Sequence, residues 1–209
     1  MFLGLVLASA TWAEPGQAVR DAFARYMATV GARDGAAAAQ LVTSGSLARE
    51  EKLRDLALEA PPAAVMAQPP ADRLAVLCLR HEFTAEELRL LSGADLVRTA
   101  VDEAWSRPKV LAALTVADVE VTGGVATLRV ERGGEAVPLR LVLRHEAEGW
   151  RIDLVELARG SDDALEAALR VRAARAGVDF ETAMKWALED TSGHLVDKDL
   201  WRPLADGAG

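Results

Sequence analysis

The chain contains few of the residues from which catalytic and metal sites are usually assembled. Its 209 residues include one cysteine, one tyrosine and three histidines. Because Cys78 is the only cysteine, no intrachain disulfide can form, and its apolar neighbours favour a small buried side chain. The nucleophile-elbow, phosphate-loop, dinucleotide-binding and HExxH zinc motifs are all absent. The sequence therefore predicts neither a cofactor nor a metal, and it does not name an activity.

Basic residues are also scarce. Asp and Glu number 32 against 24 Lys and Arg, which gives a net charge of -8 and a pI of about 5.0. Nucleic acids and anionic membranes attract clustered Lys and Arg, so we expect no nucleic-acid partner. No segment approaches the roughly 20 apolar residues of a membrane helix, so we expect no membrane span. Apolar types make up 51% of the chain, as in an ordinary globular protein.

Residues 1–13 have the pattern of a signal peptide. They carry no charge, and a short apolar run is followed by the small residues that a signal peptidase requires before its cleavage point. We therefore expect a periplasmic or secreted protein. The absence of a basic residue before Arg20 is unusual for such a peptide and is consistent with a start codon further upstream. The alternative is an apolar first helix of a cytoplasmic protein.

The segment that follows, up to about Trp105, has helical spacing. Apolar residues recur every three or four positions from Pro15 to Val30, and this periodicity predicts an amphipathic first helix. Asp34 and Ser46 are candidate N-caps of the next helices. The sequence Thr84-Ala85-Glu86-Glu87 predicts a capping box.

After Pro108 the apolar period changes from helical to alternating. Glycine pairs at 123–124 and 133–134, and Gly149, separate four alternating runs, which predicts an antiparallel meander. Helices followed by strands indicate an α+β fold, in which a curved antiparallel sheet packs on the N-terminal helices. We divide the chain into a signal peptide (1–13), an α+β domain (14–160) and a C-terminal helical extension and tail (161–209).

The last strand contains the motif Gly149-Trp150-Arg151-Ile152-Asp153. With the leading helix, the further helices and the hairpins before it, residues 15–158 resemble the NTF2-like superfamily. The resemblance implies a sheet wrapped round a long helix, forming a cone with an apolar cavity. Members of that superfamily include isomerases, dehydratases, epoxide hydrolases and many binding domains without activity. The helical insertion between Ser46 and Trp105 departs from its smallest enzymes, so catalytic positions are not transferred.

The predicted cone gives a set of candidate cavity residues and two candidate acid–base residues. His145 follows Leu139, Leu141 and Leu143 at intervals of two residues, so its side chain should point to the same face of the strand as theirs. Tyr26 lies on the apolar face of the first helix, and both residue types can serve in acid–base catalysis. The alternatives without a catalytic role are a solvated histidine and a core tyrosine whose hydroxyl reaches the rim of the cavity. The cavity-lining residues that we predict are Phe23, Tyr26, Met27, Leu139, Leu141, Leu143, Trp150 and Ile152.

Other polar residues carry weaker signals. Cys78 and His81 share a helix face and could form a thiolate–imidazole pair or two zinc ligands. A zinc site needs three or four protein ligands, so we favour a buried thiol and a histidine near a helix end. His194 lies in a polar tail and carries no signal. The parity of Asp153 predicts that it faces solvent.

Together these features favour an exported, non-catalytic NTF2-like domain that binds a small apolar ligand or a protein partner. The alternative is a cavity enzyme of the isomerase, dehydratase or hydrolase kind, with His145 and Tyr26 as the acid–base pair. A third interpretation is a structural homodimer formed through the open sheet face or the terminal helices.

Overall fold

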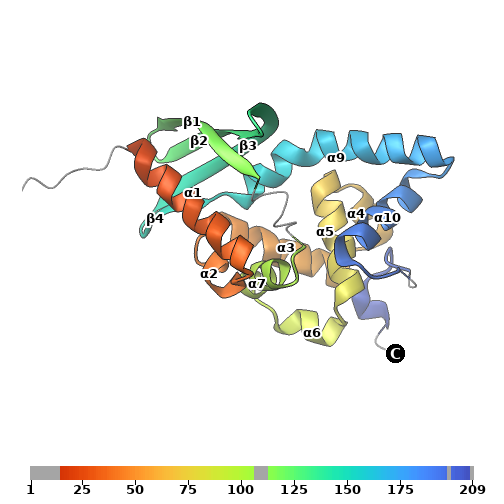
Figure 1. Cartoon of the computed structure of the whole chain (residues 1–209). Coiled ribbons are helices and arrows are strands. Elements are labelled where there is room, and N and C mark those ends of the chain that lie inside the picture. The colour runs from red at the N-terminus through yellow and green to blue at the C-terminus, as the bar shows by residue number, and fades with distance from the viewer. Residues whose placement is uncertain (1–14, 106–112, 197–198, 208–209) are drawn as a thin grey trace, which may run out of the picture.

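The computed structural model describes residues 15–105, 113–196 and 199–207, and it has an α+β fold (Figure 1). The predicted signal peptide and the predicted change of period at Pro108 lie outside these residues. Within them, none of the helices is both long and apolar enough to cross a membrane.

The first half of the chain is helical, as its spacing predicts. Asp34 caps the second helix and Thr84 forms the predicted capping box with Glu87. The expectation for Ser46 was wrong, because Thr43 is the N-cap and Ser46 is buried one turn into the helix. The helices are α1 (Pro15–Ala32), α2 (Gly35–Ala39), α3 (Ser44–Glu59), α4 (Pro62–Met66), α5 (Pro70–Glu82), α6 (Ala85–Leu90) and α7 (Gly93–Asp102).

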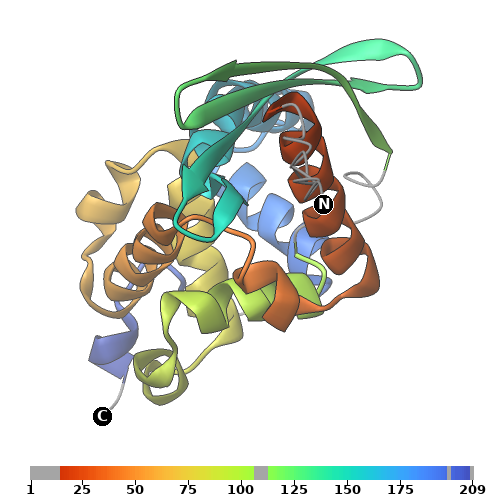
Figure 2. The same cartoon turned by 90° about the vertical axis from the view of Figure 1, so that its left-hand side faces the viewer.

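The second half contains the predicted antiparallel meander, with strand order β1-β2-β3-β4. The strands are β1 (Leu114–Thr122), β2 (Val125–Arg132), β3 (Glu135–Glu146) and β4 (Gly149–Ile152). Gly123 and Gly133 have positive φ values of 59° and 60°, which L-residues with a side chain rarely adopt, and they lie in the turns of the first two of the three hairpins. The sheet arches over α1 (Figure 2). Val42, just before α3, forms a parallel bridge with Ile152 of the last strand.

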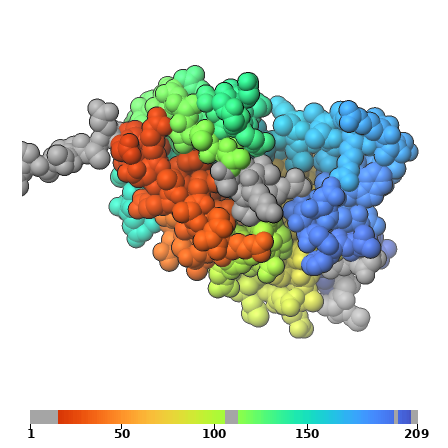
Figure 3. Space-filling model, viewed as in Figure 1, coloured from red at the N-terminus to blue at the C-terminus, as the bar shows by residue number. Residues whose placement is uncertain are grey.

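Two long helices and a short 3-10 turn complete the chain. They are α9 (Leu154–Ala176), α10 (Phe180–Ser192) and η1 (Leu204–Gly207). We expected the C-terminal extension to begin at residue 161, whereas α9 begins directly after the sheet and runs through that position. In the space-filling view α9 and α10, coloured blue, form one side of the molecule (Figure 3).

Apolar side chains gather in two cores. One joins the inner face of the sheet to α1, α2 and α7, and the other joins α3, α5 and α6 to α9, α10 and the tail. Ala126 and Leu128 of β2 lie beside Leu143 and Leu141 of β3 on the inner face, so the alternation in the sequence selects the side of the sheet that is covered. The space between the sheet and α1, α2 and α7 is therefore filled by the first of these cores.

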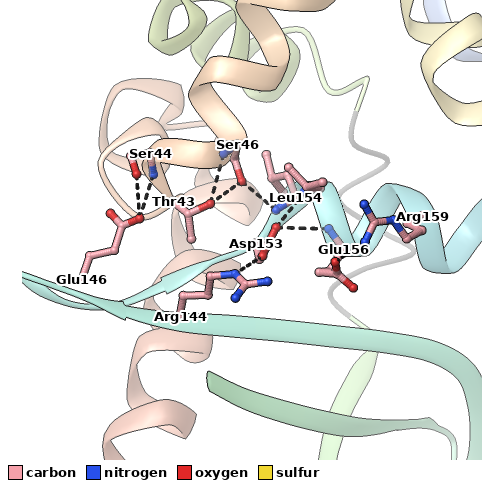
Figure 4. Close-up of polar contacts among 10 residues, drawn as sticks. Thr43, Ser44, Ser46, Arg144, Glu146, Asp153, Leu154, Glu156 and Arg159 are labelled. Carbon is pink, nitrogen blue, oxygen red and sulfur yellow. Dashed lines mark hydrogen bonds and ion pairs between the residues drawn. The ribbon is translucent and has the colours of Figure 1, made fainter. Parts of the chain in front are cut away.

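A buried polar cluster joins the end of the sheet to α3 and α9 (Figure 4). The Asp153 side chain accepts hydrogen bonds from the N–H groups of Val155 and Glu156, and its second oxygen accepts one from Arg144 Nε at 2.6 Å. Asp153 is 4% exposed, so the expectation that it faces solvent was wrong. The strand ends at Ile152. Asp153 is therefore not the next alternating residue of β4 but the N-cap of α9.

A fully buried arginine connects α5 to the tail. Arg80 of α5 donates to the carbonyl oxygens of Leu56, Ala57 and Ala60 at the C-terminal end of α3. It also donates to the carbonyl oxygens of residues 200 and 201. The end of a helix carries unpaired carbonyl groups with partial negative charge, which makes it a favourable position for the guanidinium group.

Candidate functional site

An apolar cavity of about 240 Å³ lies between α1, α7, the sheet and the first turn of α9. Tyr26 and Glu50 are the only polar residues among those that line it within the described chain. The lining is Phe23, Tyr26 and Met27 of α1; Glu50 of α3; Val97, Ala100 and Val101 of α7; Leu114, Leu141 and Ile152 of the sheet; and Leu154 and Leu157 of α9.

The structure brings five of the eight predicted cavity residues to this cavity. They are Phe23, Tyr26, Met27, Leu141 and Ile152. The other three, Leu139, Leu143 and Trp150, belong to the same core but do not line the cavity. The leading helix and the inner face of the sheet thus form one wall each. The remaining lining comes from α3, α7 and α9, which periodicity alone could not place against the sheet.

Tyr26 points its ring into the core and is 7% exposed. Its hydroxyl makes no hydrogen bond with any residue that the structure describes. Burial, and secondarily the negative charge of Glu50, raises the pKa of Tyr26 from 10.0 to about 12. At neutral pH the group is therefore a phenol that can donate a hydrogen bond into the cavity.

Glu50 is a cavity residue that we did not predict. It interrupts the apolar stripe of α3, because Leu47 and Leu53 lie three residues to either side of it, and this spacing was the available signal. Arg49 Nη1 donates to its carboxylate at 2.6 Å, while the other end of that guanidinium binds Asp72. Burial nevertheless raises the pKa of Glu50, and the ion pair with Arg49 offsets only part of this effect.

His145 does not join Tyr26. It lies on the inner face of β3, as its parity predicts, but at the exposed end of the strand. Its ring meets Trp150 edge-on, with the ring centroids 5.2 Å apart. Neither His145 nor Trp150 lines the cavity, so the structure separates the two residues that we had considered as an acid–base pair.

A second apolar cavity, of about 310 Å³, lies in the helical core and shares Glu50 and Ala100 with the first. Cys78 lines it. Burial, with a smaller contribution from the charge of Glu82, raises the pKa of the thiol from 9.0 to about 12. A thiol that stays protonated is a poor nucleophile, so Cys78 has the properties of a core residue.

Of the polar residues outside the cavities, His81, Glu82 and His194 come together where α5 ends beside the tail. Their side chains are of the types that bind transition metals. His194 was not predicted to belong to any site, and its partner His81 lies more than a hundred residues earlier in the chain.

Comparison of the chain with protein-family models, with curated proteins and with solved structures finds no match in any of the three. The function is therefore inferred from the geometry of the site. That geometry offers an apolar volume with a phenol and a carboxyl group at its wall. Such a site can hold a small molecule and orient it by one or two hydrogen bonds.

Proposed function

We propose that this protein is a binding domain of the NTF2-like kind whose cavity holds a small, mostly apolar molecule. The observation that carries the proposal is the cavity of about 240 Å³ between α1 and the sheet, lined by apolar side chains except for Tyr26 and Glu50. The sheet that arches over α1 and the closing motif 149–153 support the kinship with that superfamily (Figure 2).

The size of the cavity limits the ligand. An engineered apolar cavity of about 150 Å³ binds benzene, so the present volume has room for roughly ten non-hydrogen atoms. The Tyr26 hydroxyl makes no hydrogen bond with the described chain, and a ligand with one acceptor, such as a carbonyl oxygen, would satisfy it. The ligand class is therefore a compact apolar molecule with a single hydrogen-bond acceptor.

A matched pair of probes tests this. 1-Tetralone and tetralin have nearly the same size and differ in one carbonyl oxygen. We expect calorimetry to show that both bind and that Tyr26→Phe weakens tetralone by about three- to tenfold while leaving tetralin unchanged, as the loss of one neutral hydrogen bond implies.

Two further variants serve as controls. Ala100→Leu should obstruct the cavity and abolish binding of both probes, while Leu90→Ala, at a site 84% exposed, should change nothing. Circular dichroism shows whether each variant is folded. If neither probe binds the wild-type protein, or if Ala100→Leu binds as well as wild type, the cavity is not a ligand site.

A cavity enzyme is the second candidate, and Glu50 is the observation that favours it. A carboxyl group with a raised pKa beside a phenol in an apolar site is an arrangement suited to proton transfer. Glu50 takes the place of His145 in this hypothesis. Glu50→Gln keeps the shape of the side chain and removes its acid–base function, so it should abolish turnover of a substrate while retaining binding of tetralone.

Export is the remaining part of the proposal, and residues 1–13 carry it. The protein recovered from the periplasm of a bacterial host should have the mass of a chain that begins at Thr11 or Glu14. An intact Met1 in the cytoplasmic fraction would contradict export without affecting the cavity.

A further inference from the structure

The C-terminal end of α5 contains a buried histidine that makes no hydrogen bond with the part of the chain that the structure describes. The His81 side chain is 8% exposed, and neither ring nitrogen makes a hydrogen bond with the described chain. One carboxylate oxygen of the adjacent Glu82 is also buried and makes no hydrogen bond with the described residues. Burying polar atoms without partners costs free energy, so a cluster of three such atoms calls for a further partner.

The polar atoms near His81 are of the kinds that bind metal ions: the carboxylate oxygens of Glu82 and a ring nitrogen of His194. His81 Nε2 lies 3.6 Å from Glu82 Oε1, and His194 Nδ1 lies 3.8 Å from Glu82 Oε2. One donor atom from each of the three residues can be chosen so that all lie within 4.8 Å of one another. These separations are too long for hydrogen bonds. Ligands of a tetrahedral zinc ion with bonds of about 2.0–2.1 Å are about 3.4 Å apart, so small side-chain rotations would complete the site.

The turn after α10 holds His194 in place. Gly193 ends the helix with a φ of +78°, and the Ser192 hydroxyl accepts a hydrogen bond from the His194 N–H at 3.2 Å. Two residues later, Val196 is buried and its N–H donates to Glu189 at 3.0 Å. The backbone is thus fixed on both sides of His194, while its side chain remains 71% exposed.

We propose that His81, Glu82 and His194 bind one divalent transition-metal ion, with zinc as the best match. Two imidazoles and one carboxylate favour zinc and its neighbours over magnesium and calcium, which prefer sets of oxygen ligands. Three protein ligands leave a fourth tetrahedral position, and the exposure of His194 gives water access to it.

This site is separate from the apolar cavity, because none of its three residues lines that cavity. An ion bound there would connect the end of α5 to the segment after α10. Since the three ligands come together only in the folded chain, zinc should also raise the stability of the protein. Failure of the cavity proposal would leave the metal proposal unaffected, and the reverse also holds.

The competing explanation is a charged pair between His81 and Glu82 with no ion. It makes a different prediction for His194, which is exposed and would then contribute nothing. His194→Ala is therefore the decisive variant, and its exposure means that the fold should tolerate it. His145→Ala is the matched control, because it removes a histidine from the far end of the sheet.

The experiment titrates zinc into full-length, tag-free protein that has been stripped with a chelator, using calorimetry for affinity and native mass spectrometry for stoichiometry. We expect one zinc per chain, an affinity lowered by more than about tenfold in His194→Ala and Glu82→Gln, and no change in His145→Ala. Thermal unfolding should shift upward with zinc in wild type and His145→Ala only.

Two results would overturn the proposal. One is a wild-type protein that takes up no stoichiometric zinc at micromolar concentration. The other is a His194→Ala variant that binds zinc as tightly as wild type, since this would show that any bound ion lies elsewhere.

Discussion

Raising the pH should destabilise this protein through Tyr26. The buried phenol has a pKa of about 12, against 10.0 for an unperturbed tyrosine. The unfolded chain therefore loses the proton first, and the free energy of unfolding falls as the pH rises between these two values. Each pKa unit corresponds to about 1.4 kcal/mol, so the loss approaches 2.7 kcal/mol above both pKa values and is about 2 kcal/mol near pH 12. Below about pH 9 the phenol is protonated in both the folded and the unfolded chain, so no stability is lost through Tyr26.

The assay compares urea unfolding of wild type and Tyr26→Phe at a series of pH values. Other groups that titrate in this range, including Cys78, contribute equally to both proteins, so the difference between the two curves isolates the phenol. Because Tyr26 is the only tyrosine, the ultraviolet absorbance of tyrosinate also reports its pKa directly. A midpoint near the ordinary value, with parallel stability curves, would show that the phenol is solvated and would refute its burial.

Three more predictions concern single positions. The Cys78 thiol, with a pKa of about 12, should react with Ellman's reagent far more slowly in the native protein than in urea, and equal rates would contradict its burial. Arg80→Met should lower the free energy of unfolding by at least about 3 kcal/mol, measured by urea titration, because five backbone carbonyls lose their donor. In Gly35→Ala the new Cβ would lie 2.2 Å from the Arg98 carbonyl oxygen, so we expect a cost of about 1–3 kcal/mol by the same measurement. Gly31→Ala, where nothing lies within 4 Å, is its control and should not be destabilising.

The meander could be predicted because its signals are local. Glycine pairs mark the turns, and alternation along β2 and β3 identifies the buried face. The same alternation failed at Asp153, because it applies only while the chain remains extended. The strand stops at Ile152, and the next side chain turns back to cap α9. A helix start that follows a strand without a loop gives no turn signal by which it could be recognised.

The sites depend on contacts that are distant in the sequence. Glu50 could have been recognised as a misplaced charge in an apolar stripe, but the cavity that it faces is formed by α1, α7 and the sheet. His194 gives no local signal at all, since its neighbours are polar and irregular. Only the path of the tail past α5 brings it to His81. The sequence contains three histidines, but only the fold shows that His81 and His194 lie beside each other.

The Arg80 anchor also constrains when the chain can finish folding. Its guanidinium bonds to carbonyl groups 120 and 121 residues further along the sequence, so these bonds cannot form until residues 200 and 201 have been synthesised. Before that point the buried cation would lack two of its acceptors, and the helical core would remain open on that side. Packing of the helical core around Arg80 therefore waits for a segment that is synthesised long after α5.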